Sequence, residues 1–203
     1  MRIGIFGGTF DPPHIGHLIA AQDAREALQL DRVLFVPAGQ PPHKSQRPIS
    51  DGAVRRAMLE AALEDDPGFE VCLIELERTG ASYTVDTLRQ LLQERPGDSF
   101  FLLVGADQVR DFQTWHEPEE IVRLVTVVPL ARAGVDTFPA LESRLHAPVR
   151  VTRIDVSATD IRERVRTGKT IRYLVLPAVE QLIRQRGLYR NAPSPGQVAA
   201  TNE

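Results

Sequence analysis

Cysteine and tryptophan are nearly absent from this chain of 203 residues, which holds one of each, Cys72 and Trp115. A single thiol excludes an intrachain disulfide and a zinc site built from several cysteines. No apolar run approaches the ~20 residues that cross a bilayer, so we expect no membrane segment and no membrane partner. The chain enters an apolar stretch within a few residues of Met1, and no signal peptide is expected. These absences predict a cytoplasmic protein.

An excess of basic charge is also missing, since 24 Lys and Arg residues face 27 Asp and Glu residues, with a net charge of -3. This balance argues against a nucleic-acid partner, although basic residues can still gather at a site for an anionic substrate. Hydrophobic residues make up 42% and charged residues 25%, as in ordinary globular proteins. The length suits one α/β domain with a sizeable core. The oligomeric state stays open, a homo-oligomer included.

Apolar runs alternate with amphipathic segments, which predicts an α/β fold with a doubly wound parallel sheet. Strands are expected at 2–6, 32–37, 69–76, 99–104, 124–130 and 149–154. Helices are expected at 18–30, from Ser50 or Asp51 onward, and at 84–94, 118–123, 161–166 and 177–186, with a short helix or turn at 109–115 and a weak helix at 138–145. Beyond a domain at 1–190, residues 191–203 are rich in Pro, Ser and Ala and predict a flexible tail.

The stretch GGTFDPPHIGH at 7–17 joins the first expected strand to the first expected helix. Glycines in such a turn let the backbone approach an anion, and the helix N-terminus supplies N–H groups and a positive dipole end. His14 and His17 are three residues apart at this helix start and therefore project from one face. Two imidazoles beside a phosphate cradle predict stabilisation of charge on a reacting phosphate. An ATPase P-loop is excluded because no Lys follows Gly16, and the dinucleotide fingerprint is absent too.

This stretch resembles the G-x-F-D-P-x-H-x-G-H signature of the nucleotidyltransferase superfamily, whose members move AMP or CMP from a nucleoside triphosphate onto a phosphate. Four further stretches are similar to segments of its bacterial nicotinate-mononucleotide adenylyltransferase branch. They are PPHK at 41–44, SYTVDTL at 82–88, GAD at 105–107 followed by Trp115, and VSATDIR at 156–162. The resemblance covers residues 2–190, and one departure is Ala158, where a second Ser is common.

The resemblance implies a Rossmann-like nucleotidyltransferase fold with a C-terminal helical portion. It also implies transfer of AMP from ATP to nicotinate mononucleotide, giving deamido-NAD and pyrophosphate in NAD biosynthesis, by direct in-line attack without a covalent intermediate. His14, His17 and Arg162 are implied as catalytic groups that bind ATP. Further ATP contacts are implied for Gly7, Gly8, Thr9, Phe10, Gly105, Asp107, Ser157 and Thr159. Mg²⁺ is expected on the ATP phosphates rather than in a dedicated carboxylate cage.

Contacts with nicotinate mononucleotide are implied for Lys44, Thr84, Asp107 and Trp115. The flexible Lys44 ammonium suits a phosphate, and the Trp115 indole suits stacking on a flat pyridine ring. At a helix start, Thr84 can present a hydroxyl and backbone N–H groups to the nicotinate carboxylate. Asp107, at the carboxyl end of a strand, can accept hydrogen bonds from sugar hydroxyls.

Plainer roles stay open for several of these residues. Thr84, Asp107 and Ser157 can each cap a helix, and Trp115 can pack in the core. Cys72, placed in the middle of an expected strand, is interpreted as a core residue. Two other functions also stay open. One is the same chemistry with another acceptor, such as pantetheine phosphate, or with CTP as donor. The other is a nucleotide-binding or regulatory module without turnover.

Overall fold

The computed structural model describes residues 1–39, 49–132 and 145–190, without the side chains of Asp107 and Arg132. The Pro-rich loop with Lys44, most of the expected weak helix at 138–145 and the tail at 191–203 therefore lie outside the described residues.

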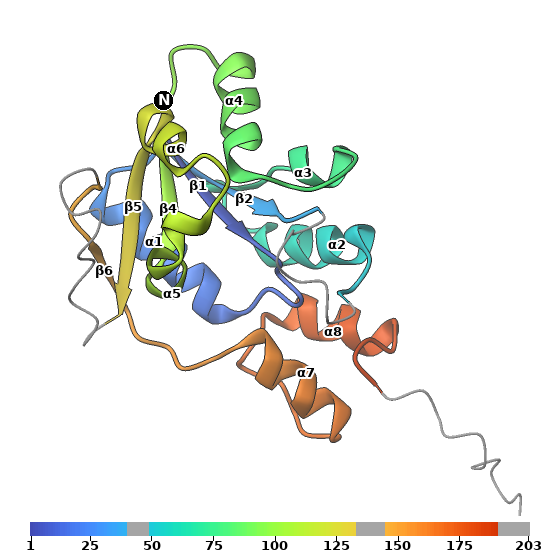
Figure 1. The fold of residues 1–203 in the computed structure, drawn as a ribbon. Coiled ribbons are helices and arrows are strands. Elements are labelled where there is room, and N and C mark those ends of the chain that lie inside the picture. The colour runs from blue at the N-terminus through green and yellow to red at the C-terminus, as the bar shows by residue number, and fades with distance from the viewer. Residues whose placement is uncertain (40–48, 133–144, 191–203) are drawn as a thin grey trace, which may run out of the picture.

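A parallel sheet of six strands forms the centre of the described part of the chain (Figure 1). The strands are β1 (Arg2–Gly8), β2 (Arg32–Pro37), β3 (Phe69–Val71), β4 (Ser99–Gly105), β5 (Thr126–Arg132) and β6 (Val149–Val151). Their spatial order is β3-β2-β1-β4-β5-β6, and every neighbouring pair is parallel. The strand order reverses at β1 and β4, and open α/β sheets bind ligands beyond the carboxyl ends of the strands at such a point.

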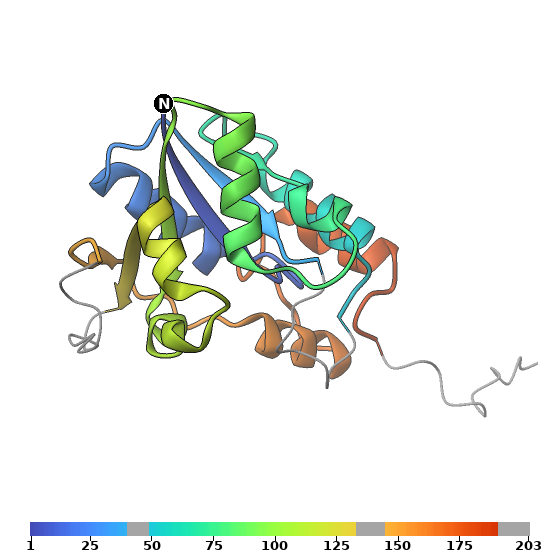
Figure 2. The same ribbon diagram turned by 45° about the horizontal axis from the view of Figure 1, so that its top comes forward.

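Helices cover both faces of this sheet (Figure 2). One face packs against α1 (Ile15–Ala27), α2 (Gly52–Leu63) and α8 (Pro177–Gln185). The other packs against α4 (Thr84–Glu94), α5 (Ala106–Arg110) and α6 (Pro118–Leu124). The short α3 (Ile74–Glu77) and the 3-10 turn η1 (Phe112–Thr114) pack on the same face as α4. Helix α7 (Ala158–Arg166) lies beyond the carboxyl ends of β1 and β4 in both views.

Successive strand residues point to opposite faces and so enter two separate apolar clusters. In β2, Val33 and Phe35 pack toward α1 and α2, whereas Leu34 and Val36 pack toward α4. All four of these side chains are 0–1% exposed. Burial on both faces explains why the strands appear in the sequence as uninterrupted apolar runs, and it confirms the predicted fold class.

The first helix begins earlier than predicted. It starts at Ile15 rather than Leu18, with His14 as its N-cap residue. The apolar periodicity that marked the helix begins only at Leu18, because the first turn is occupied by the motif residues and not by core residues. His17 therefore lies inside the first helical turn instead of ahead of it.

The prediction of a strand at 69–76 is wrong in its second half. β3 ends at Val71, and the chain turns into the one-turn helix α3. Short runs of mixed apolar residues fit a strand or a helix equally well, and periodicity cannot separate them. Cys72 consequently follows the strand and is only partly buried against the α4 side of the core. This burial raises the pKa of the Cys72 thiol.

The strands at the other edge of the sheet are also shifted. β5 begins at Thr126 and not at Leu124, because α6 continues through Leu124, and β6 ends at Val151 instead of Ile154. The expected helices at 84–94, 118–123 and 177–186 are confirmed within one residue. None of the helices in the described ranges has the length and apolar character of a membrane span.

Candidate active site

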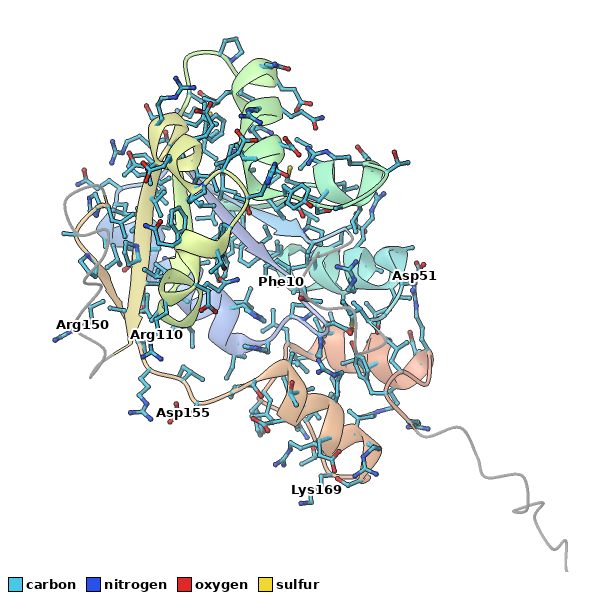
Figure 3. The ribbon with its side chains drawn as sticks, in the orientation of Figure 1. Phe10, Asp51, Arg110, Arg150, Asp155 and Lys169 are labelled. Atoms are coloured by element: carbon cyan, nitrogen blue, oxygen red, sulfur yellow. The ribbon has the colours of Figure 1, made fainter. Side chains whose placement is uncertain are left out.

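The turn after β1 is shaped by a phenylalanine that points inward. Phe10 adopts a left-handed backbone conformation with φ of 49°, and its ring is 2% exposed. A Cβ atom at Gly8 would lie 2.9 Å from Cζ of that ring, so glycine is required there. The ring also meets the His17 ring edge-to-face, with centroids 5.0 Å apart. Phe10, labelled in Figure 3, thus packs against the His17 ring, and only its backbone is left to meet a ligand.

His14 and His17 lie together at the N-terminus of α1, as their spacing predicted. Their rings stack with centroids 3.6 Å apart and planes inclined by 24°. The His14 backbone N–H donates a hydrogen bond to His17 Nδ1 at 3.2 Å. Because Nδ1 acts as the acceptor, the proton of the neutral ring belongs on Nε2, which is then a donor. The positive end of the helix dipole adds to the preference of this position for an anion.

Arg162 reaches the same turn from the distant helix α7. Its Nη1 donates to the Asp11 carbonyl oxygen at 2.6 Å, and its Nη2 donates to Thr159 Oγ1 at 3.0 Å. Ser157 is the N-cap residue of α7, and its hydroxyl oxygen accepts from the Asp160 backbone N–H at 3.1 Å. The expected helix cap is confirmed, although the helix begins at Ala158 rather than Ile161. The fold therefore brings the two histidines and the α7 guanidinium together.

A buried carboxylate anchors this turn. Asp11 is 4% exposed, and its Oδ1 accepts from the Tyr189 hydroxyl at 2.6 Å while its Oδ2 accepts from the Ser50 N–H at 3.1 Å. Arg55 donates to the Thr9 and Ser50 carbonyl oxygens at 3.1 and 3.0 Å. Burial and the contact with Asp11 raise the pKa of Tyr189, so the phenol keeps its proton and donates. The starts of α1 and α2 and the segment after α8 are thus joined.

Replacing Tyr189 with Phe should lower the free energy of unfolding by about 1.5–3 kcal/mol, because it removes a hydrogen bond to a buried charged group. Urea denaturation followed by circular dichroism measures this loss. The matched control is Tyr173→Phe, since Tyr173 is 78% exposed and its loss should leave stability unchanged. Equal stability of the Tyr189 variant and the wild type would contradict the anchoring role of this contact.

A cavity of about 240 Å³ lies on the α4 side of the sheet, at the carboxyl ends of β1 and β2. Five of the predicted site residues line it: Gly7, Gly8, Thr9, Thr84 and Trp115. Six of its polar or aromatic lining residues were not predicted as site residues: Glu75, Ser82, Tyr83, Thr87, Gln108 and His116. Ser82, Tyr83 and Thr87 had a usable signal, since they belong to the SYTVDTL stretch at 82–88, and so did His116, which directly follows Trp115. Thr9 and the glycines belong to the motif turn, so the cavity adjoins the histidine site.

Trp115 packs beside the core, and its predicted stacking on a pyridine ring stays a prediction. Its ring packs against Phe112, with centroids 5.2 Å apart, and it also lines the cavity. Thr84 is the first residue of α4 rather than its cap, because Tyr83 is the N-cap residue. The alternative that Thr84 caps the helix is therefore wrong. The first N–H groups of a helix have no partner within it, and at α4 they lie beside the cavity lined by Tyr83 and Thr84. The Tyr83 ring lies 4.4 Å from the His116 ring, centroid to centroid.

Two predicted site residues are not placed by these contacts. Lys44 lies outside the described residues, and the side chain of Asp107 is not described, although its backbone belongs to α5. Gly105 ends β4 and is the N-cap residue of α5. In the described ranges, no cluster of three or more His, Cys, Asp or Glu side chains could hold a metal ion. The donors gathered at the α1 turn instead suit phosphate oxygens.

The fold and the histidine pair at its first helix define a nucleotidyltransferase. The family model described as cytidylyltransferase-like matches residues 5–164. A solved Plasmodium falciparum nicotinic acid mononucleotide adenylyltransferase complexed with NaAD shares the fold, with a TM-score of 0.74 at 18% identity, covering 93% of this chain and 97% of that chain. A putative nicotinate-nucleotide adenylyltransferase from Vibrio parahaemolyticus has a TM-score of 0.71 at 23% identity, covering 95% and 98%.

Curated relatives show which kind of nucleotidyltransferase this chain resembles. A protein of Shouchella clausii is 48% identical over 188 residues, which cover 93% of this chain and 96% of the relative. A protein of Thermus thermophilus is 47% identical over 191 residues, covering 94% and 100%. Both carry the name "probable nicotinate-nucleotide adenylyltransferase". The chain belongs to the nicotinate-nucleotide adenylyltransferase family.

Proposed function

We propose that the chain transfers AMP from ATP to nicotinate mononucleotide and releases deamido-NAD and pyrophosphate. The observation that carries this function is the stacked His14–His17 pair at the α1 N-terminus, with Arg162 bound to the same turn. The adjoining cavity, lined by Thr84 and Trp115, supplies a second compartment for a flat acceptor. Membership of the family supports the choice of reaction.

The phosphate side of the site binds ATP. The Nε2–H of His17 and the neighbouring His14 donate to phosphate oxygens and stabilise the charge that grows as pyrophosphate departs. Arg162 neutralises the β- and γ-phosphates. The backbone of 7–10 and the side chains of Ser157 and Thr159 add contacts to ATP, and Gly105 and Asp107 do so from the end of β4.

The acceptor lies in the cavity. Its pyridine ring stacks on Trp115, and the Thr84 hydroxyl with the first N–H groups of α4 receives the nicotinate carboxylate. Lys44 binds the acceptor phosphate, and Asp107 accepts from sugar hydroxyls. An oxygen of that phosphate attacks the α-phosphorus of ATP in line. The bond between the α-phosphorus and the oxygen that bridges it to the β-phosphorus breaks, and pyrophosphate leaves. The attacking phosphate is already ionised at neutral pH, so no general base is needed.

Mg²⁺, held by the ATP phosphates, would supply further charge neutralisation as pyrophosphate departs. The chain's own residues fit this arrangement because the His17 Nε2–H and the Arg162 guanidinium lie at the α1 turn as donors for the remaining phosphate oxygens. The expected cytoplasmic location and any homo-oligomer stay predictions.

Pyrophosphate release with ATP and Mg²⁺, compared between nicotinate and nicotinamide mononucleotide, tests the function. We expect release to be much faster with nicotinate mononucleotide, because donors that bind a carboxylate cannot form hydrogen bonds with the NH₂ group of the amide. Equal release would keep the adenylyltransferase and remove its nicotinate preference. If neither substrate gave release, the same assay would be repeated with pantetheine phosphate as acceptor and with CTP as donor. Tight ATP binding without turnover on the whole panel would instead favour a regulatory module.

A further inference from the structure

Glu75 is a buried carboxylate in a place that the phosphate chemistry does not use. It lies on α3, is 9% exposed, and lines the cavity that the acceptor would occupy. The Thr87 hydroxyl, from the first turns of α4, donates to its Oε1 at 2.9 Å. The Gly39 backbone N–H and the Ser82 hydroxyl also donate to this carboxylate. Figure 1 shows α3 beside the N-terminal end of α4.

Arg78 extends this set of contacts along α4. Its Nη1 donates to Thr87 Oγ1 at 3.2 Å, and its Nη2 donates to Gln90 Oε1 at 2.8 Å. The Thr87 hydroxyl therefore accepts a hydrogen bond from Arg78 and donates one to Glu75. Such a chain of hydrogen bonds fixes the rotamers of every member, and each bond polarises the next.

Gly39 packs directly on the backbone of α3. A Cβ atom there would lie 2.2 Å from the Glu75 carbonyl oxygen and 2.6 Å from Ser82 Oγ. No side chain larger than hydrogen fits, so the chain leaving β2 lies against α3 and the segment before α4. Three walls of the cavity thus meet at one carboxylate: the end of β2, the turn at Ser82 and helix α4.

We propose that Glu75 is the positioning residue of the acceptor site, holding the Ser82–Thr84 turn, and with it the first N–H groups of α4, against the chain that leaves β2. The identity of the acceptor rests on the proposed function. The positioning itself rests only on the contacts of Glu75, Gly39, Ser82 and Thr87.

Burial raises the pKa of Glu75, and the facing groups Thr87, Gly39, Arg78 and Ser82 oppose this rise only in part. A carboxyl whose pKa rises on folding contributes stability below its ordinary pKa of 4.5, and this contribution is lost as pH rises through the folded pKa. Glu75→Gln removes this dependence on pH, but it also turns an amide NH₂ toward a site lined by three donors, so one hydrogen bond of the carboxylate is lost.

The test compares Glu75→Gln with Glu77→Gln, which removes an exposed carboxylate from the same one-turn helix. For Glu75→Gln we expect the KM for nicotinate mononucleotide to rise on the order of 10-fold, since small displacements of positioning groups have effects up to about 10²-fold. The KM for ATP should stay unchanged. Glu77→Gln should match the wild type throughout.

Amide hydrogen exchange at 82–87 supplies a readout that needs no acceptor. It should accelerate in Glu75→Gln and stay at the wild-type rate in Glu77→Gln. Unchanged exchange, an unchanged acceptor KM, or an equal rise of both KM values with a lower melting temperature would each overturn the positioning role. A wild type that does not turn over nicotinate mononucleotide would instead contradict the proposed function, and hydrogen exchange would still decide the role of Glu75.

Discussion

Replacing His17 with Ala is expected to lower kcat for pyrophosphate release by about 10²–10³-fold, the usual effect of removing one donor that stabilises charge in the transition state. The Nε2–H of His17 is the donor in question, because its Nδ1 accepts the His14 backbone N–H. The KM for either substrate should change less than kcat, since the contact strengthens as the pyrophosphate leaves. Steady-state kinetics with a coupled pyrophosphate assay measures both quantities.

His17→Asn separates the chemical role of the ring from its structural role. An Asn carboxamide oxygen can take the place of Nδ1 as acceptor for the His14 N–H, but nothing replaces the Nε2 donor. We expect this variant to keep the wild-type melting temperature and to lose as much kcat as His17→Ala. His146→Ala is the matched control, because that ring is exposed and its Nδ1 lies 2.7 Å from the neighbouring Ala147 carbonyl oxygen. Retained kcat in His17→Asn would show that the ring acts only as a helix cap.

The fold class was predictable because both faces of the sheet are buried. Strands such as β2 then appear as apolar runs and helices such as α4 as amphipathic segments, and these two periods differ enough to be separated. The order of the strands was not predictable from this pattern. It depends on which neighbours the right-handed crossovers select, and no local residue pattern records that choice. The boundary between β3 and α3 was also missed, because the run at 69–76 is too short to show a period.

The candidate site also contains residues that were predictable and residues that were not. His14, His17, Thr84 and Trp115 were found because each belongs to a continuous motif whose local structure is fixed by its own residues. Their supports were missed because each acts through distant partners. Tyr189 holds Asp11 across most of the chain, and Glu75 holds Gly39 and Thr87 from a helix that the sequence did not predict. A buried charged residue carries no sequence signal until its partners are known.

These supports are also organised by function. One carboxylate, Asp11, joins the turn that would meet the phosphates to α2 and to the segment after α8. A second, Glu75, joins the walls of the cavity that would hold the acceptor. Both places consist of loops and helix ends from separate parts of the chain, whose relative geometry has to be fixed by contacts between them. Buried hydrogen-bonded carboxylates supply that geometry, since leaving either one partly unpaired would be costly.

Arg162→Ala should lower kcat/KM for ATP by about 10²–10³-fold, because it removes a charged fork from the phosphates and releases the Asp11 carbonyl oxygen that Nη1 holds. Arg162→Lys should recover only part of this loss. Its ammonium can face a phosphate, but a point charge cannot also span the Asp11 carbonyl and Thr159 Oγ1 as the planar guanidinium does. Steady-state kinetics with varied ATP, together with calorimetric titration of ATP, measures both variants.

Arg166→Ala is the matched control for this experiment. Arg166 lies on the same helix, is exposed, and pairs with Glu163 rather than with the β1–α1 turn. Its loss should leave kcat/KM for ATP within about twofold, because surface ion pairs contribute little. If kcat/KM for ATP fell by the same factor in the Arg162 and Arg166 variants, the effect would come from the net charge of the helix as a whole. A loss confined to Arg162 would place the effect at the guanidinium that touches the turn, and its partial recovery by Lys would separate charge neutralisation from the geometry of the fork.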